Sequence, residues 1–186
     1  MSEHRELLVA LDVPSTDQPG LADAVTAWLR STGWARPDPA AAALEFPSGE
    51  PDFLAERADD FLMDRPGRAR DTLVGTVSCG VGNPMWDAVD SMEGPSCWFC
   101  RRTVADDDDV SRLGDWIGGD EPVYTCAGCG AVSLAGDMDV SASLVVGNPG
   151  VVLITPDHDG PAMAVGLIDE LRLAFPNRWA YVHQRR

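Results

Sequence analysis

The sequence contains no lysine, so all fourteen of its basic residues are arginines, and they face thirty aspartates and glutamates. The resulting net charge is −16. Nucleic-acid binding draws on cationic contacts to phosphates, which this charge opposes. The composition therefore predicts that the chain does not bind DNA or RNA, and it favours a basic protein as partner.

Histidine is also scarce, with only His4, His158 and His183. A histidine-rich catalytic metal site is hard to build from three residues so far apart. No run of eighteen apolar residues occurs, which predicts that no helix spans a membrane. The apolar stretch behind the N-terminus, Leu7 to Leu11, is too short for a signal-peptide core. We therefore expect a cytoplasmic protein, in which cysteines stay reduced.

Four of the five cysteines form two motifs of identical spacing, Cys97-Trp98-Phe99-Cys100 and Cys126-Ala127-Gly128-Cys129. Two such Cys-x-x-Cys elbows can place four thiolates around one tetrahedral Zn²⁺. Residues 93–133 resemble a zinc ribbon, in which two hairpin tips each supply one knuckle. The alternatives are two disulfides or four free thiols, and these need an oxidising compartment or coincidence.

The expected ion is structural, with one Zn²⁺ per chain ligated by Cys97, Cys100, Cys126 and Cys129. A catalytic zinc keeps a position open for water, whereas four cysteines close the shell. Trp98 and Phe99 lie between the first two ligands. We expect them to fold over the zinc; exposed, they would instead form an anchor for a protein partner.

Hydrophobic patterning predicts an α+β protein. Residues 6–12 and 151–155 have the composition of buried strands, and helices are expected at 18–32 and 161–175. Because both ends follow the same strand–turn–helix plan, we expect a split β–α–β, ferredoxin-like sandwich. Residues 1–92 and 134–186 would then form one α+β domain, with 93–133 as a zinc-ribbon insertion.

The middle of the chain gives weaker patterns. Apolar residues at helical spacing from Phe53 to Leu62 indicate a helix capped by Asp52, and residues 72–79 indicate a strand. A further strand is expected at 140–146, and a last one at 179–183.

Two other places carry chemistry-bearing residues. Asp157-His158-Asp159 follows a predicted strand and precedes a helix, where ligands often gather, but the same residues are common in a turn that caps a helix. Cys79 ends a predicted strand and has no base nearby, which favours core packing over nucleophilic catalysis. We assign no catalytic and no cofactor-binding residue.

The sequence therefore indicates a non-enzymatic, acidic, zinc-stabilised binding module for a basic protein partner. Immunity or antitoxin proteins that cover a cationic active site are one version of this class, by analogy of charge alone. The run Asp106–Asp109 lies between the two knuckles, where residues 101–125 hold seven acids and three arginines. The alternative is an enzyme or small-ligand-binding protein that uses Asp12, Asp157, Asp159 and His158. The sequence does not indicate an oligomeric state.

Overall fold

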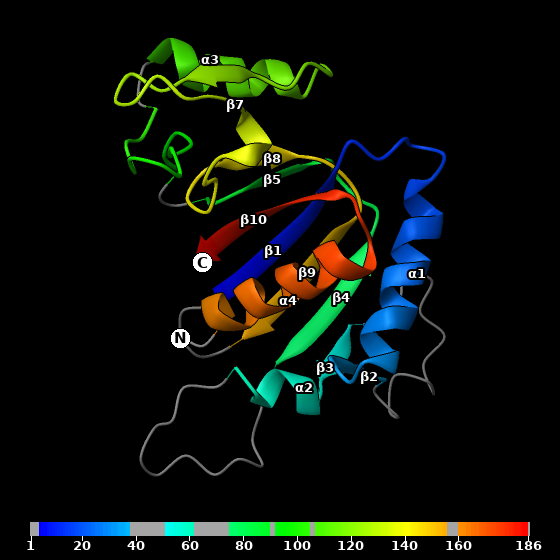
Figure 1. Ribbon diagram of the computed structural model, residues 1–186. Helices are drawn as coiled ribbons and strands as arrows, with labels where there is room; N and C mark the ends of the chain where they lie inside the picture. Colours follow the sequence, from blue (N-terminus) through cyan, green and yellow to red (C-terminus); the bar gives the residue numbers. More distant parts are fainter. Residues whose placement is uncertain are drawn as a thin grey trace, which may run out of the picture.

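The computed structural model describes residues 4–37, 51–61, 75–89, 92–104, 107–155 and 160–185. Its elements run along the chain as follows (Figure 1): β1 His4–Leu11, α1 Gln18–Ser31, β2 Ala35–Arg36, β3 Asp52–Leu54, α2 Glu56–Asp59, β4 Thr76–Gly80, β5 Met85–Asp87, α3 Asp107–Trp116, β6 Val123–Thr125, β7 Val132–Leu134, η2 Ala135–Asp137, β8 Leu144–Val146, β9 Gly150–Thr155, α4 Gly160–Ala174 and β10 Arg178–Arg185.

The main sheet has six strands in the order β10-β1-β9-β4-β3-β2, and every neighbouring pair is antiparallel. The N-terminal strand is therefore interior, between β9 and the C-terminal strand β10. Helices α1 and α4 follow β1 and β9 along the chain. The α+β class is confirmed, as is the pairing of residues 6–12 with 151–155 in one sheet. The ferredoxin-like arrangement within that class stays a prediction.

Strand β1 is buried on both faces because its side chains alternate between two cores. Leu8 and Ala10 belong to one hydrophobic cluster, and Leu7, Val9 and Leu11 to another. Alternation with a period of two is a property of extended backbone. A strand covered on both sides is expected to be almost continuously apolar.

The first core lies beneath α1 and α4, which begin and end within a residue of their predicted bounds. Val25 and Leu29 of α1 meet Leu167 and Leu171 of α4 in the same cluster. The two helices therefore share one core, as the apolar stripes of both segments predict. Pro19 occupies the first turn of α1, where its missing N–H costs no helical hydrogen bond.

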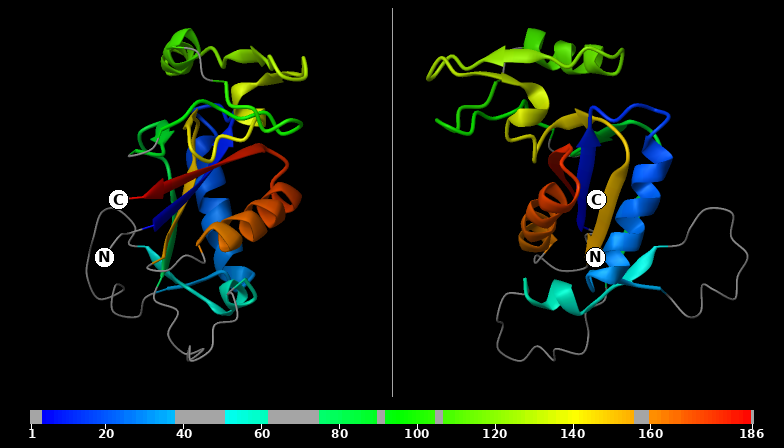
Figure 2. Two further views of the ribbon diagram at one scale, coloured as in Figure 1. Left: turned by 90° about the vertical axis from the view of Figure 1, so that its left-hand side faces the viewer. Right: turned by 45° about the vertical axis from the view of Figure 1, so that its right-hand side comes forward.

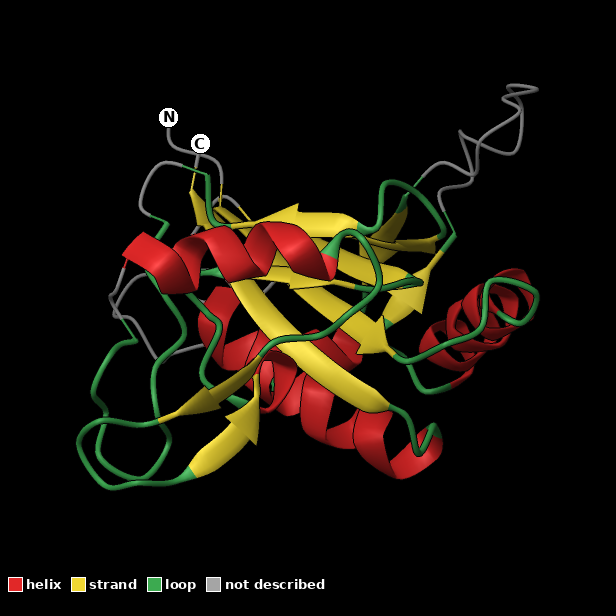
Figure 3. Cartoon of the chain, turned by 90° about the horizontal axis from the view of Figure 1, so that it is seen from above, coloured by secondary structure: helices red, strands yellow, loops and turns green. Residues whose placement is uncertain are grey.

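The second core covers the opposite face of the sheet. Strands β5 and β8 pair with each other there, and the β6–β7 hairpin and α3 lie beyond them. Figure 2 shows these elements gathered at one end of the molecule, and Figure 3 looks down on that end, with α1 seen nearly end-on at the right. Cys97, Cys126 and Trp116 share this cluster with Val9 and Val182 of the sheet. The division into a 1–92 plus 134–186 domain and a 93–133 insertion stays a proposal, since this core crosses the boundary.

Two elements differ from their predictions, and a third, helix α3, was not predicted. Residues 52–54 form strand β3 and only Glu56–Asp59 form a helix, because β3 is held between β2 and β4. The acidic run opens helix α3, and Asp106 lies outside the described residues. The strand expected at 140–146 is confined to β8.

Candidate metal centre

The two Cys-x-x-Cys segments are built alike. In the first, the Cys97 N–H donates to Arg102 O at 3.0 Å and the Arg101 N–H to Cys97 O at 2.8 Å. The second repeats both bonds: Cys126 N to Ala131 O and Gly130 N to Cys126 O, each at 2.8 Å. Each segment is thus a closed turn of the same shape, as two knuckles of a zinc ribbon require.

The same position in each turn has a left-handed backbone. The residue after the second cysteine has φ of 58° at Arg101 and 75° at Gly130. Glycine adopts this region readily, whereas a residue with a Cβ pays about 1–2 kcal/mol for it. Arg101 has local contacts that offset this cost: its guanidinium lies 4.9 Å from the Trp98 ring centroid and 3.2 Å from Asp139.

The four sulfurs meet between the turns. All four Sγ atoms of Cys97, Cys100, Cys126 and Cys129 lie within 4.8 Å of one another. Across the turns, the Sγ atoms of Cys97 and Cys129 lie 3.6 Å apart and those of Cys100 and Cys126 lie 3.4 Å apart. A tetrahedral zinc with Zn–S bonds of about 2.3 Å separates its sulfurs by about 3.8 Å, whereas a disulfide needs about 2.05 Å. The donor set therefore fits a metal ion closely.

Backbone N–H groups in the second turn stabilise the thiolate form of its cysteines, which is the form that binds a cation. N–H groups of Cys129 and Gly128 donate to the Cys126 sulfur, Gly128 at 3.4 Å, and lower the pKa of its thiol to about 6. The Ala131 N–H favours a thiolate at Cys129, yet the thiol of Cys97 and partial burial raise the pKa of Cys129 to about 11. A sulfur that ionises readily thus lies beside one that does not, and a divalent cation would bring both to the thiolate form.

Gly128 has little room for a larger residue. A Cβ at this position would lie 3.0 Å from Cys100 Sγ and 3.4 Å from the Arg102 side chain. The glycine thus lets the second turn approach the first closely enough for the four sulfurs to meet.

The centre is buried on one side and open on the other. Cys97 and Cys126 are buried within the second core, whereas Cys100 and Cys129 are exposed. Trp98 is 52% exposed and Phe99 82% exposed. The expectation that these aromatics fold over the metal site is wrong, because the open side of the turn carries them outward.

The other predicted residues do not join this centre. Asp157, His158 and Asp159 lie outside the described residues. Asp12 has a left-handed backbone and an ion pair with Arg178 at 2.6 Å. Cys79 packs against the first core, and burial, with a smaller effect of Asp23, raises the pKa of its thiol to about 12.

One polar cluster was missed by the sequence analysis. Glu6 is fully buried in β1, and its Oε2 accepts hydrogen bonds from the Tyr181 hydroxyl at 2.7 Å and from His183 Nδ1 at 2.8 Å. The ring of His183 stacks on His4. The available signal was a glutamate directly before an apolar strand, facing a Tyr-x-His strand at the other end of the chain.

Comparison with protein-family models, with curated proteins and with solved structures found no match for this chain. Among the described residues, no helix is long and apolar enough to cross a membrane. The sulfur geometry is therefore the observation from which a function has to be argued.

Proposed function

We propose that this chain is a non-enzymatic, acidic binding module for a basic protein partner, held in shape by one structural zinc ion. Cys97, Cys100, Cys126 and Cys129 would be the four ligands. The observation that carries the metal assignment is the convergence of their sulfurs within 4.8 Å from two turns of the same shape. Four thiolates fill a tetrahedral shell and exclude water, so the ion would stabilise the fold rather than catalyse a reaction.

The choice of partner rests on charge and on the exposed aromatics. The chain carries −16, and a zinc bound by four thiolates adds a formal −2 rather than reducing that charge. Such a field repels nucleic acid and speeds the approach of a cationic protein. Phe99 and Trp98 project from the first turn, and large aromatics are frequent anchors at the centres of interfaces.

The two halves of this proposal depend on one another. The turn that exposes Phe99 also carries two of the ligands, so a bound metal would hold the aromatic in place. An immunity-like or antitoxin-like protein, which covers a cationic surface, is one version of such a module. The proposed insertion at 93–133 would then be the part that meets the partner.

Native mass spectrometry tests the metal. We expect one zinc per chain, lost in the Cys100→Ser and Cys129→Ser double variant. A metal-free protein with two intact disulfides would refute the assignment.

Partner capture by the zinc-loaded protein, followed by kinetics with the purified partner, tests the rest. We expect a partner of high isoelectric point whose association rate falls as salt increases, and a weaker complex with Phe99→Ala. Tight, salt-sensitive binding to plain duplex DNA would contradict the proposal, as would an acidic partner bound equally at all salt concentrations.

A further inference from the structure

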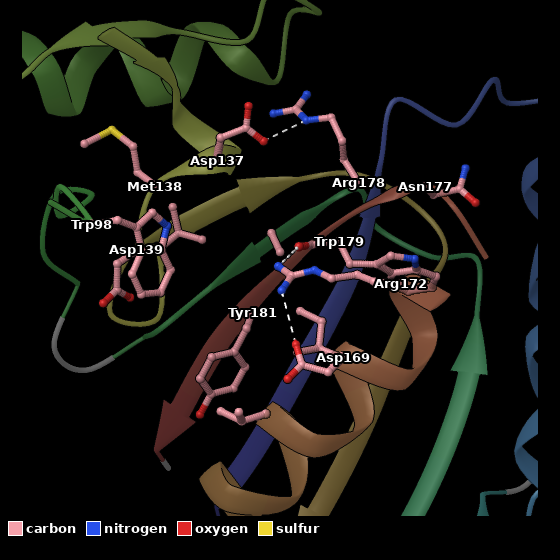
Figure 4. Close-up of a pocket in the computed structure, with 15 residues that line it drawn as sticks. Trp98, Asp137, Met138, Asp139, Asp169, Arg172, Asn177, Arg178, Trp179 and Tyr181 are labelled. Atoms are coloured by element: carbon pink, nitrogen blue, oxygen red, sulfur yellow. Dashed lines mark hydrogen bonds and ion pairs between the residues drawn. The ribbon is translucent and has the colours of Figure 1, made fainter. Parts of the chain in front are cut away.

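A groove of about 370 Å³ runs along β10, away from the four cysteines. One wall is formed by α4, with the exposed Val165 and the largely buried Ile168. The other wall comes from the side of the candidate metal centre, with Trp98 and Met138. Trp179 and Tyr181 of β10 line it between the walls. Figure 4 shows the strand crossing the groove, with α4 below it and Trp98 above.

The floor of this groove is an open strand edge. β10 is the outermost strand of the sheet and pairs with β1 on one side only. The His183 N–H donates to Ser141 O at 2.8 Å, which places the backbone groups of residue 183 on the side away from β1. Backbone direction alternates along a strand, so Tyr181 presents its N–H and C=O on that same side.

Tyr181 is therefore the residue that can pair. The edge carbonyl of Trp179 already accepts from Arg172 at 2.9 Å. The N–H and C=O of Tyr181 have no hydrogen-bond partner within the part of the chain that the structure describes. Exposed edges that bind nothing are commonly blocked by charge, proline or a bulge. This edge lies at the bottom of a groove whose walls carry apolar side chains beside charged ones.

We propose that this groove binds an extended, basic segment of the partner protein, which adds to the sheet as a strand beside β10. Main-chain bonds to Tyr181 would hold the segment, and its alternate side chains would face the two walls. Apolar side chains would contact Val165 and Ile168. Basic ones would reach the opposite wall, where they would share Trp98 and Asp139 with Arg101, and Asp137 with Arg178.

Local charge favours a cationic occupant. Arg178 alone holds three carboxylates, Asp12, Glu121 and Asp137, at 2.6 to 2.9 Å. Two further pairs, Arg101–Asp139 and Arg172–Asp169, balance each other. Of these residues, Asp137, Asp139 and Asp169 line the groove together with Arg172 and Arg178, which leaves a surplus of one negative charge in its lining. A second copy of this chain is a poor occupant, since it brings a charge of −16 to the same surface.

This inference rests on the proposed function, whose partner it places at a particular edge of the sheet. Trp98 connects the two, because it lines the groove and lies between two proposed zinc ligands. Loss of zinc is therefore expected to weaken binding in the groove even though no ligand of the metal faces it.

The first test uses a short synthetic peptide in which arginine alternates with valine, labelled for fluorescence anisotropy at low salt. We expect binding, with slower hydrogen exchange of the Tyr181 amide by NMR. N-methylation of one alternate set of peptide amides should abolish binding and that of the other set should be tolerated, because an added strand bonds through one edge. Equal effects of the two sets, or no binding, would overturn the proposal.

A matched pair of variants locates the site. Val165→Lys and Leu173→Lys each add one positive charge to an exposed apolar position of α4, 54% and 87% exposed, but only Val165 lines the groove. We expect Val165→Lys to weaken peptide binding about tenfold and Leu173→Lys to have a smaller effect, with circular dichroism melts checking that both fold. Equal losses of affinity in the two variants would show that peptide binding depends on net charge alone. That result would overturn the proposal that the peptide binds in the groove, and it would leave the basic-partner proposal standing. Concentration-dependent protection of the Tyr181 amide without peptide would identify a second copy as the occupant, and would also overturn it.

Discussion

The five cysteines of this chain lie in two different environments. Four meet in the candidate metal centre, where backbone N–H groups donate to the sulfurs of Cys126 and Cys129. Cys79 packs against the first core, where desolvation disfavours the thiolate. Their reactivities should therefore separate sharply once the metal is removed.

Alkylation with iodoacetamide at pH 9, mapped by mass spectrometry, tests this separation. We expect the chelator-treated protein to be modified at the four knuckle cysteines and to stay unmodified at Cys79 until denaturant is added. A raised pKa means that the folded state holds the Cys79 proton more tightly than the unfolded state. Its contribution to stability is complete below about pH 9 and is lost as pH rises toward about 12. Prompt labelling of Cys79 in the native protein would contradict its burial.

Gly128 gives a second prediction at the scale of a residue. Gly128→Ala places a methyl group 3.0 Å from Cys100 Sγ, so either the thiol or the turn must move. Overpacking of this kind costs about 1–3 kcal/mol, which corresponds to zinc affinity weaker by roughly 5- to 150-fold. Competition with a chromogenic chelator measures the change. Gly82→Ala is the control, since nothing lies within 4 Å of its added methyl group, and equal affinities of the two variants would contradict the crowding argument.

Helix α3 shows how an element can be missed when its charge is prominent. Its sequence opens with aspartates that have the composition of a solvated loop. Acidic residues at a helix N-terminus are nevertheless favoured by the helix dipole, and Leu113 and Trp116 of α3 are buried three residues apart. Those two side chains pack in the second core with Tyr124 of the hairpin, a contact that no local pattern reveals.

Replacing Asp106–Asp109 by asparagine tests what the charge of α3 does. We expect the association rate with a cationic partner to fall several-fold at low ionic strength and the difference to vanish at high salt, since screening removes long-range attraction. Unfolding free energy should change by less than about 1 kcal/mol per residue, through lost dipole interactions. Stopped-flow kinetics measures the rate.

The matched control for α3 neutralises four exposed acids of the other helices, Asp17, Asp23, Glu56 and Asp59. If both quadruple variants slow association equally, the effect belongs to net charge and α3 has no special part in it.

Elements that depend on interactions between residues close in sequence could be predicted, and elements that depend on distant residues could not. β1, α1, α4 and β10 have apolar periodicity strong enough to identify them, and their bounds were close. Strand β3 could not be identified in this way. Its three residues form a strand only because they pair with residues such as Ala35 and Thr76, which are distant along the chain. The cysteine spacing predicted the metal centre, whereas the groove joins Trp98, Val165 and Tyr181 from three separate segments and has no local signal.

At the scale of the whole molecule, the sheet separates two cores of different origin. The core beneath α1 and α4 contains none of the four proposed metal ligands. The other contains Cys97 and Cys126 and would depend on the metal for part of its stability. Free zinc at a hundredfold excess over its dissociation constant would raise the free energy of unfolding by about 2.7 kcal/mol.

Hydrogen exchange after chelation tests that asymmetry. We expect amides of α3, β6 and β7 to lose protection while those of β1, β9 and α4 largely retain it, because the first core needs no metal. Adding zinc back should restore the difference, and the Cys100→Ser and Cys129→Ser double variant should not respond to chelator. Uniform loss of protection throughout the chain would mean that the two cores fold as one cooperative unit.

The interior position of β1 sets the order in which this chain can fold during synthesis. Residues 4–11 are synthesised well before their neighbours in the sheet, residues 150–155 and 178–185. Closing so large a loop is slow and entropically costly. Until residues 150–155 emerge, β1 has no strand beside it, and its second edge stays unpaired until residues 178–185 follow. The two cysteine turns are closed by residues 97 to 131, so the candidate metal centre can assemble before β1 finds its neighbouring strands. A nascent chain of this protein could thus form the candidate metal centre before its main sheet is complete, and its exposure to aggregation or to chaperones would last until residues 178–185 have been synthesised.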